Sequence, residues 1–217
     1  MAEAARYESA GLVHRFMPGL RFDGLWRYAV RESESTLRWD ELPLESEVSR
    51  ASGDPEGAWW CVRRCVAVLG QRAWRLVRPP QALQRCPSIA QVERVLQAML
   101  PGWDLGAEQG RGPASMNAII RALEQGGCAL VRLVLQSPRR QGVCWAWVVG
   151  VEMRARAPVQ AHERALLVVG APWHAPWGCG YGARLMPGEH GAWVVRSTEG
   201  QCVACEAVEV VVLEPAP

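Results

Sequence analysis

The sequence predicts an α+β protein in which N-terminal helices pack on one side of an antiparallel β-sheet. Two observations support this fold class. Apolar residues recur at helical spacing in the first part of the chain, and short apolar segments separated by turn residues fill the part after residue 128. With 217 residues, 49% of them hydrophobic, the chain is long and apolar enough to bury a sizeable core.

The first part of the chain divides into an extension and the start of the main body. We expect residues 1–50 to form an N-terminal extension packed on that body, and residues 51–217 to form the α+β domain. The extension mixes apolar side chains with glycine and charged residues, and a short strand is expected near residues 25–30. Residues 52–57 read Ser-Gly-Asp-Pro-Glu-Gly, a turn that leads into the first helix.

Three helices are expected next. The first begins near Cys61 and runs to about Leu76. Ser88 opens the second, with Gln91 three residues later in the capping-box position, and Ser115 caps the third. The glycine-rich stretch between the second and third helices is expected to be a loop.

The second half of the chain reads as strands in an antiparallel meander. Runs rich in valine, leucine and tryptophan alternate with turn residues such as Pro-Gly and Glu-Gly, which is typical of short strands joined by tight connections. The expected strands span residues 129–135, 143–153, 165–169, 193–196 and 208–213.

Cys61 is the first candidate functional residue. It follows two tryptophans at the expected start of a helix, where free backbone N–H groups and the helix dipole favour a thiolate. A thiolate there is a nucleophile. The alternative is that Cys61 is a small apolar filler of the core, a common role for free cysteine.

Three segments together resemble the C39-like branch of the papain-like cysteine peptidases. Residues 61–69 are similar to the nucleophile helix, and residues 118–135 are similar to the helix, glycine turn and strand that enter the sheet of that family. Residues 144–151 and 165–172 are similar to its next two strands. The resemblance implies a papain-like α+β fold with a cleft between helices and sheet.

The resemblance also assigns catalytic positions. Cys61 falls on the nucleophile, Cys144 falls where the family has histidine, and Gly170 falls where it has aspartate or asparagine. The glutamine that would hold an oxyanion is absent from residues 53–57. The family's chemistry needs all four groups. The chain is therefore expected to be a catalytically degenerate homologue.

Such a homologue would act by binding a peptide or protein partner in the former cleft. The expected lining beside Cys61 consists of four tryptophans, Trp59, Trp60, Trp145 and Trp173. The alternative is an active cysteine peptidase or acyltransferase in which Cys61 works with a relocated histidine, His174. A disulfide between Cys61 and Cys144 is a separate hypothesis.

No cofactor, metal, nucleic-acid or membrane partner is expected. The formal net charge is only +2, and the glycine-rich residues 178–182 match no nucleotide-binding pattern. Cys202 and Cys205 have C-x-x-C spacing but lack a second ligand pair, and their odd separation puts them on opposite faces of a strand. No run of 18 apolar residues occurs.

The expected location is cytoplasmic, because the N-terminus lacks a basic start followed by an apolar run. Secretion without a cleaved signal is the alternative. The 24 basic residues are all arginine, which is typical of a GC-rich bacterial genome. Avoidance of ubiquitin in a host cell, as in a bacterial effector, would also remove lysine, the residue that ubiquitin modifies.

Overall fold

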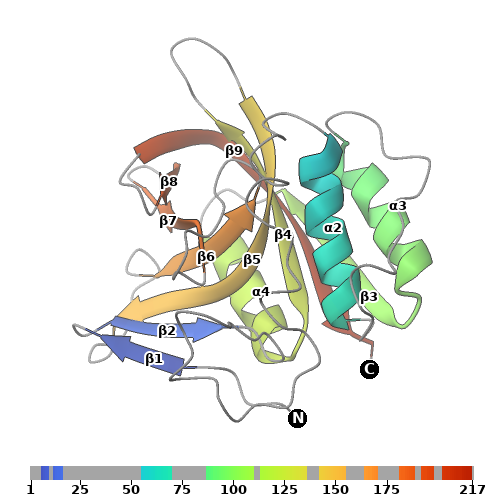
Figure 1. The fold of residues 1–217 in the computed structure, drawn as a ribbon, viewed down its shortest axis with the longest axis horizontal. Helices are drawn as coiled ribbons and strands as arrows, with labels where there is room; N and C mark the ends of the chain where they lie inside the picture. Colours follow the sequence, from blue (N-terminus) through green and yellow to red (C-terminus); the bar gives the residue numbers. More distant parts are fainter. Residues whose placement is uncertain are drawn as a thin grey trace.

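One antiparallel β-sheet of nine strands organises the molecule in the computed structural model (Figure 1). The structure describes residues 6–9, 12–16, 55–69, 87–109, 113–135, 142–154, 164–170, 181–188, 192–197 and 202–216. Its strands are β1 (Arg6–Ser9), β2 (Leu12–Phe16), β3 (Trp103–Gln109), β4 (Cys128–Leu135), β5 (Gly142–Arg154), β6 (Ala165–Gly170), β7 (Ala183–Pro187), β8 (Trp193–Ser197) and β9 (Cys202–Pro215). Its helices are α2 (Pro55–Leu69), α3 (Ile89–Met99) and α4 (Pro113–Glu124).

Six of the strands close into a barrel. β5, β6, β7, β8 and β9 pair in sequence order as an antiparallel meander, and β4 joins the two ends by pairing with both β5 and β9. Closure leaves these six strands with few free edges, which removes sites for unwanted strand pairing. β1 and β2 extend the sheet from β5, and β3 extends it from β9.

The two longest strands, β5 and β9, connect the barrel to these extensions. β5 pairs with β4 through residues 142–148 and with β2 through residues 150–154. β9 pairs with β8 through residues 202–205 and with β3 through residues 209–215. The register of β5 against β6 shifts between Val148 and Gly150, and such irregularities increase the local bend of a strand.

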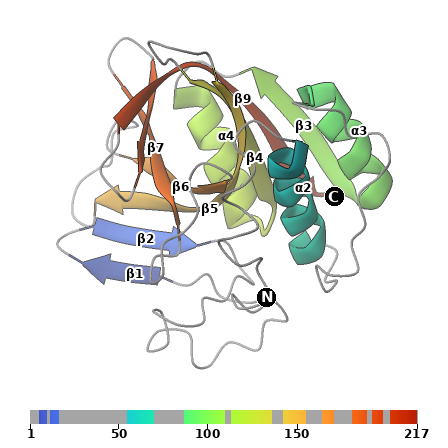
Figure 2. The ribbon, with the colours of Figure 1, turned by 45° about the horizontal axis from the view of Figure 1, so that its top comes forward.

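The papain-like α+β prediction is therefore wrong. The sheet does not present one flat face to a layer of helices, but curls until its own strands enclose a core (Figure 2). One of the six strands that close the barrel, β7, was not predicted from the sequence. The side chains of the six strands fill the inside of the barrel, so this core does not need a complete layer of helices to cover it. The helices cover only part of the outer surface.

Alternation along the strands identifies the inner face of the barrel. On β8, the buried residues Trp193, Val195 and Ser197 alternate with the partly or fully exposed Val194 and Arg196. All six residues of β6 are buried, and so are residues 144–150 of β5. These two strands are therefore covered on both faces, which explains why their sequences read as continuous apolar runs.

The three helices pack against one part of the sheet, formed by β3, β4, β5, β6 and β9. α2 lies against β5, β4 and β6, α3 lies against α2, β3 and β9, and α4 lies against β4 and β9. Figures 1 and 2 show α2 and α3 side by side, away from β7 and β8. The buried face of α3 consists of Val92, Val95 and Leu96.

Two local signals at the helix ends are confirmed. The side chain of Ser88 accepts a hydrogen bond from the Gln91 backbone, and the Gln91 side chain accepts one from the Ser88 backbone at 2.8 Å, which completes the expected capping box. α4 ends at the predicted glycine turn, where Gly126 has φ of 82°. However, α4 begins at Pro113, so Ser115 is a buried residue inside it and not its cap.

Candidate functional site

Cys61 does not lie in the first turn of its helix. α2 begins at Pro55, and proline is favoured at a first helical position because its missing N–H has no intrahelical partner there. Cys61 is six residues further along, where the backbone N–H groups around it bond within the helix. The predicted stabilisation of a thiolate by free N–H groups and the helix dipole is therefore absent.

The Cys61 side chain is a core residue. It is 0% exposed, and burial raises the pKa of its thiol well above the ordinary value. The neighbouring thiols of Cys144 and Cys128 raise this pKa further, and the Arg64 guanidinium lowers it by less. At neutral pH the Cys61 sulfur is protonated and out of contact with solvent. The sulfur of a catalytic cysteine, in contrast, is an accessible thiolate.

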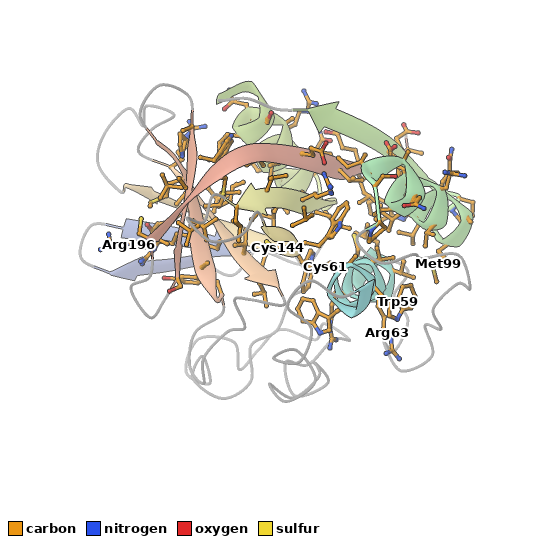
Figure 3. The ribbon with its side chains drawn as sticks, turned by 90° about the horizontal axis from the view of Figure 1, so that it is seen from above. Trp59, Cys61, Arg63, Met99, Cys144 and Arg196 are labelled. Carbon is orange, nitrogen blue, oxygen red and sulfur yellow. The ribbon has the colours of Figure 1, made fainter. Side chains whose placement is uncertain are left out.

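Cys144 lies on β5, close to Cys61 but on the inner side of the sheet (Figure 3). Alternation places Cys144 and Trp147 on opposite faces of β5. Cys144 is buried, its thiol contacts the Leu133 carbonyl at 3.9 Å, and burial followed by the nearby Cys205 thiol raises its pKa. Cys61 and Cys144 are both free thiols, and both side chains are buried.

Gly170 has a structural reason to be glycine. It is the last residue of β6 and pairs with Ala146 of β5. A Cβ on Gly170 would overlap the Trp145 carbonyl oxygen and lie 3.0 Å from the Ala146 Cα. Because any side chain would collide with the β5 backbone, neither aspartate nor asparagine fits at the position that the family resemblance assigned to them.

The four tryptophans of the expected cleft lie in different surroundings. Trp145 is buried in the core, and its indole N–H has no acceptor among the residues that the structure describes. Trp59 and Trp60 of α2 are half-buried and pack against the same core, with the Arg64 guanidinium 5.4 Å from the Trp60 ring centroid. Trp173 and the alternative base His174 lie outside the described residues.

The structure instead gathers thiols beneath α2. Cys61 and Cys65 are one helical turn apart on α2, and both are fully buried. A side-chain hydrogen bond joins Cys65 to Cys128, the first residue of β4. The Trp147 indole donates to the Cys128 sulfur from 2.9 Å. The sequence analysis missed this cluster because Cys128 precedes the expected strand and its pairing is nonlocal.

The other feature missed from sequence is the strand β3. Residues 103–109 were expected to be loop, yet they pair with β9 along their full length. Trp103 and Leu105 are half-buried against the core, whereas Asp104 and Gly106 are exposed. This alternation of apolar and polar residues was the available signal, although Gly106 weakened it.

Cys202 and Cys205 lie as their spacing predicted. Cys202 is exposed at the start of β9, and Cys205 is buried three residues later, facing Trp193. Across the described ranges, no three His, Cys, Asp or Glu side chains are placed to hold a metal ion together. In the same part of the chain, no helix is both long and apolar enough to cross a membrane.

No protein-family model matches this chain. No curated protein matches it at a significant level either.

Proposed function

We propose that this protein is a non-catalytic binding protein that holds an extended segment of a peptide or protein partner along the outer edge of β3. The observation that carries the proposal is the pairing of β3. It pairs with β9 on one side, and among the described residues no strand pairs with its other side. A seven-residue edge of this kind presents a row of backbone donors and acceptors, to which a partner strand adds by main-chain hydrogen bonds.

The charge of β3 favours a foreign segment over a second copy of this chain. Antiparallel self-pairing centred on Asp104 would set the Asp104 carboxylates of the two copies opposite one another, and like charges directly opposite one another destabilise a sheet. Asp104 also lies opposite Glu214 of β9. An arginine- or lysine-bearing segment would complement this edge.

The cysteine peptidase or acyltransferase alternative has less support. It needs the Cys61 sulfur to reach a substrate carbonyl as a thiolate. Cys61 is fully buried, and its pKa is raised. Binding at β3 needs no thiol, and it uses a surface that the fold leaves without a described partner strand.

The test is selection from a randomised peptide library displayed on phage, followed by affinity measurement with the enriched peptides made synthetically. The proposal expects enrichment of extended peptides that carry arginine or lysine. Asp104→Arg is expected to weaken their binding by roughly tenfold, because it replaces attraction with repulsion at the edge. Glu93→Arg makes the same charge change on α3 and serves as the matched control.

A second variant tests the backbone contact. Leu105→Pro and Gly106→Pro each remove one β3 N–H, and on consecutive strand residues these N–H groups point to opposite edges. One of the two is expected to abolish binding while leaving the barrel folded, as judged by circular dichroism. Equal binding by both variants and by Asp104→Arg would contradict binding at this edge.

A further inference from the structure

Partner binding does not account for four buried thiols that lie on α2 and on the two strands, β4 and β5, against which α2 packs. Cys61 and Cys65 lie on α2, Cys128 lies on β4, and Cys144 lies on β5. All four are free thiols and all four are buried. Only Cys65 and Cys128 are joined to each other by a side-chain hydrogen bond within this group. These two sulfurs belong to elements far apart in the sequence that pack directly against one another.

Trp147 makes the two members of this pair chemically different. Its indole N–H donates a hydrogen bond to the Cys128 sulfur from 2.9 Å. The Cys65 thiol is held in its protonated form by burial and by its hydrogen bond to Cys128. Cys128 is therefore the sulfur that an oxidant converts first, and Cys65 is the thiol in place to resolve the product.

We propose that Cys65 and Cys128 are a latent disulfide pair that hydrogen peroxide closes, tying α2 covalently to β4. The Cys128 sulfur attacks one peroxide oxygen, the O–O bond breaks, and a sulfenic acid and hydroxide form. The Cys65 sulfur then attacks the Cys128 sulfur, the S–O bond breaks, and the second hydroxide leaves. The two thiol protons convert the two hydroxides to water, so two thiols and one peroxide give one disulfide and two waters.

The proposed site suits a small oxidant. Cys65 and Cys128 are both 0% exposed, so a bulky disulfide reagent has no approach, whereas peroxide is close to water in size. The cross-link would close a loop of more than 60 residues between α2 and β4. A long closed loop lowers the entropy of the unfolded chain, so the oxidised protein is expected to be the more stable form.

Peptide mapping tests the pair directly. The folded protein is treated with hydrogen peroxide, its remaining thiols are blocked with N-ethylmaleimide, and it is digested with trypsin. Cleavage after arginine places Cys61, Cys65 and Cys128 on three different peptides, the last two spanning residues 65–72 and 122–132. The expected product joins these two peptides with the loss of two hydrogens, and the melting midpoint rises by roughly 10 °C.

Three variants separate the roles. Cys61→Ala, on the same helix and equally buried, is expected to keep the cross-link. Cys65→Ala is expected to stop at the sulfenic acid, which dimedone traps on residues 122–132, and Cys128→Ala is expected to give neither product. A cross-link between any other pair in the wild-type protein, or complete blocking of Cys65 and Cys128 by maleimide after denaturation, would overturn the proposal.

Discussion

The Cα of Gly170 on β6 lies against the carbonyl oxygen of Trp145 on β5, with no room between them for a Cβ atom. The two strands are neighbours in the barrel, and Gly170 pairs with Ala146. This close approach lets β5 and β6 converge where β6 ends. It also explains why residue 170 is glycine. The family resemblance had assigned this position to an aspartate or asparagine that the chain has lost.

We therefore predict that Gly170→Ala destabilises the protein by about 2 to 3 kcal/mol, because overpacking forces the two strands apart. Gly170→Asp should cost more, since it adds a buried carboxylate without a partner. Urea denaturation monitored by tryptophan fluorescence measures both. Gly106→Ala is the control, because a Cβ there meets nothing within 4 Å. Equal stability of the Gly170→Ala and Gly106→Ala variants would contradict the close approach.

Cysteine labelling tests the burial of Cys61. Among the cysteines that the structure describes, iodoacetamide near neutral pH should modify Cys202 first, because its side chain is exposed at the start of β9. Cys61 should react more slowly by a factor of at least about 100, since its thiol is buried and its pKa is raised. Mass spectrometry of tryptic peptides gives the rate at each site. Labelling of Cys61 ahead of Cys202 would restore the nucleophile hypothesis.

Local sequence signals predicted the local structure well. Ser88 and Gln91 lie within one helical turn, so their capping box could be recognised without any tertiary information. The glycine turn after α4 and the strands β4, β5, β6 and β8 were recognisable in the same way. Where the signal was ambiguous, the boundaries were wrong. The Pro-Glu-Gly segment at residues 55–57 reads equally well as a turn and as a helix start, and it forms the first residues of α2.

The barrel and the site depended on contacts that no local pattern encodes. Pairing of β4 with β9 closes the barrel across more than 70 residues, and a run of valines does not specify which strand it joins. The role proposed for Cys61 depended on the helix start, so an error of six residues removed its physical basis. The role of Gly170 depended on how close β5 approaches, which only the folded backbone reveals.

The buried thiols predict how stability changes with pH. Burial raises the pKa of Cys205 from about 9 to about 11, and it raises those of Cys61, Cys65 and Cys144 as well. Above pH 9 the unfolded chain loses these protons while the folded chain keeps them, so the free energy of unfolding falls as pH rises. Each such thiol contributes a slope of up to about 1.4 kcal/mol per pH unit.

Urea denaturation at pH 7, 8, 9 and 10 measures this dependence. Stability should be nearly level from pH 7 to 8 and should fall between pH 9 and 10. Cys205→Ala should make that fall shallower, and Cys202→Ser, which removes an exposed thiol from the same strand, is the matched control. A wild-type stability that rises from pH 9 to 10 would be inconsistent with buried protonated thiols.

Arg184 of β7 and Glu152 of β5 form an ion pair that spans the intervening strand β6. The Arg184 Nε donates to Glu152 Oε2 at 2.8 Å, and the guanidinium also lies 5.3 Å from the Tyr181 ring centroid. Glu152 is buried and Arg184 is partly exposed, so the two partners are not equivalent. Arg184→Met should cost about 2 to 3 kcal/mol, because it removes the cation from a buried carboxylate.

Glu152→Gln should cost less, roughly 1 kcal/mol, because a neutral amide oxygen still accepts from Arg184 and no buried charge remains. The double variant Arg184→Met with Glu152→Gln should be more stable than Arg184→Met alone, since it removes the carboxylate that the single change leaves without this cation. Thermal and urea unfolding of the four proteins complete a double-mutant cycle. Strictly additive effects would mean that the ion pair contributes nothing to holding β5 and β7 in register.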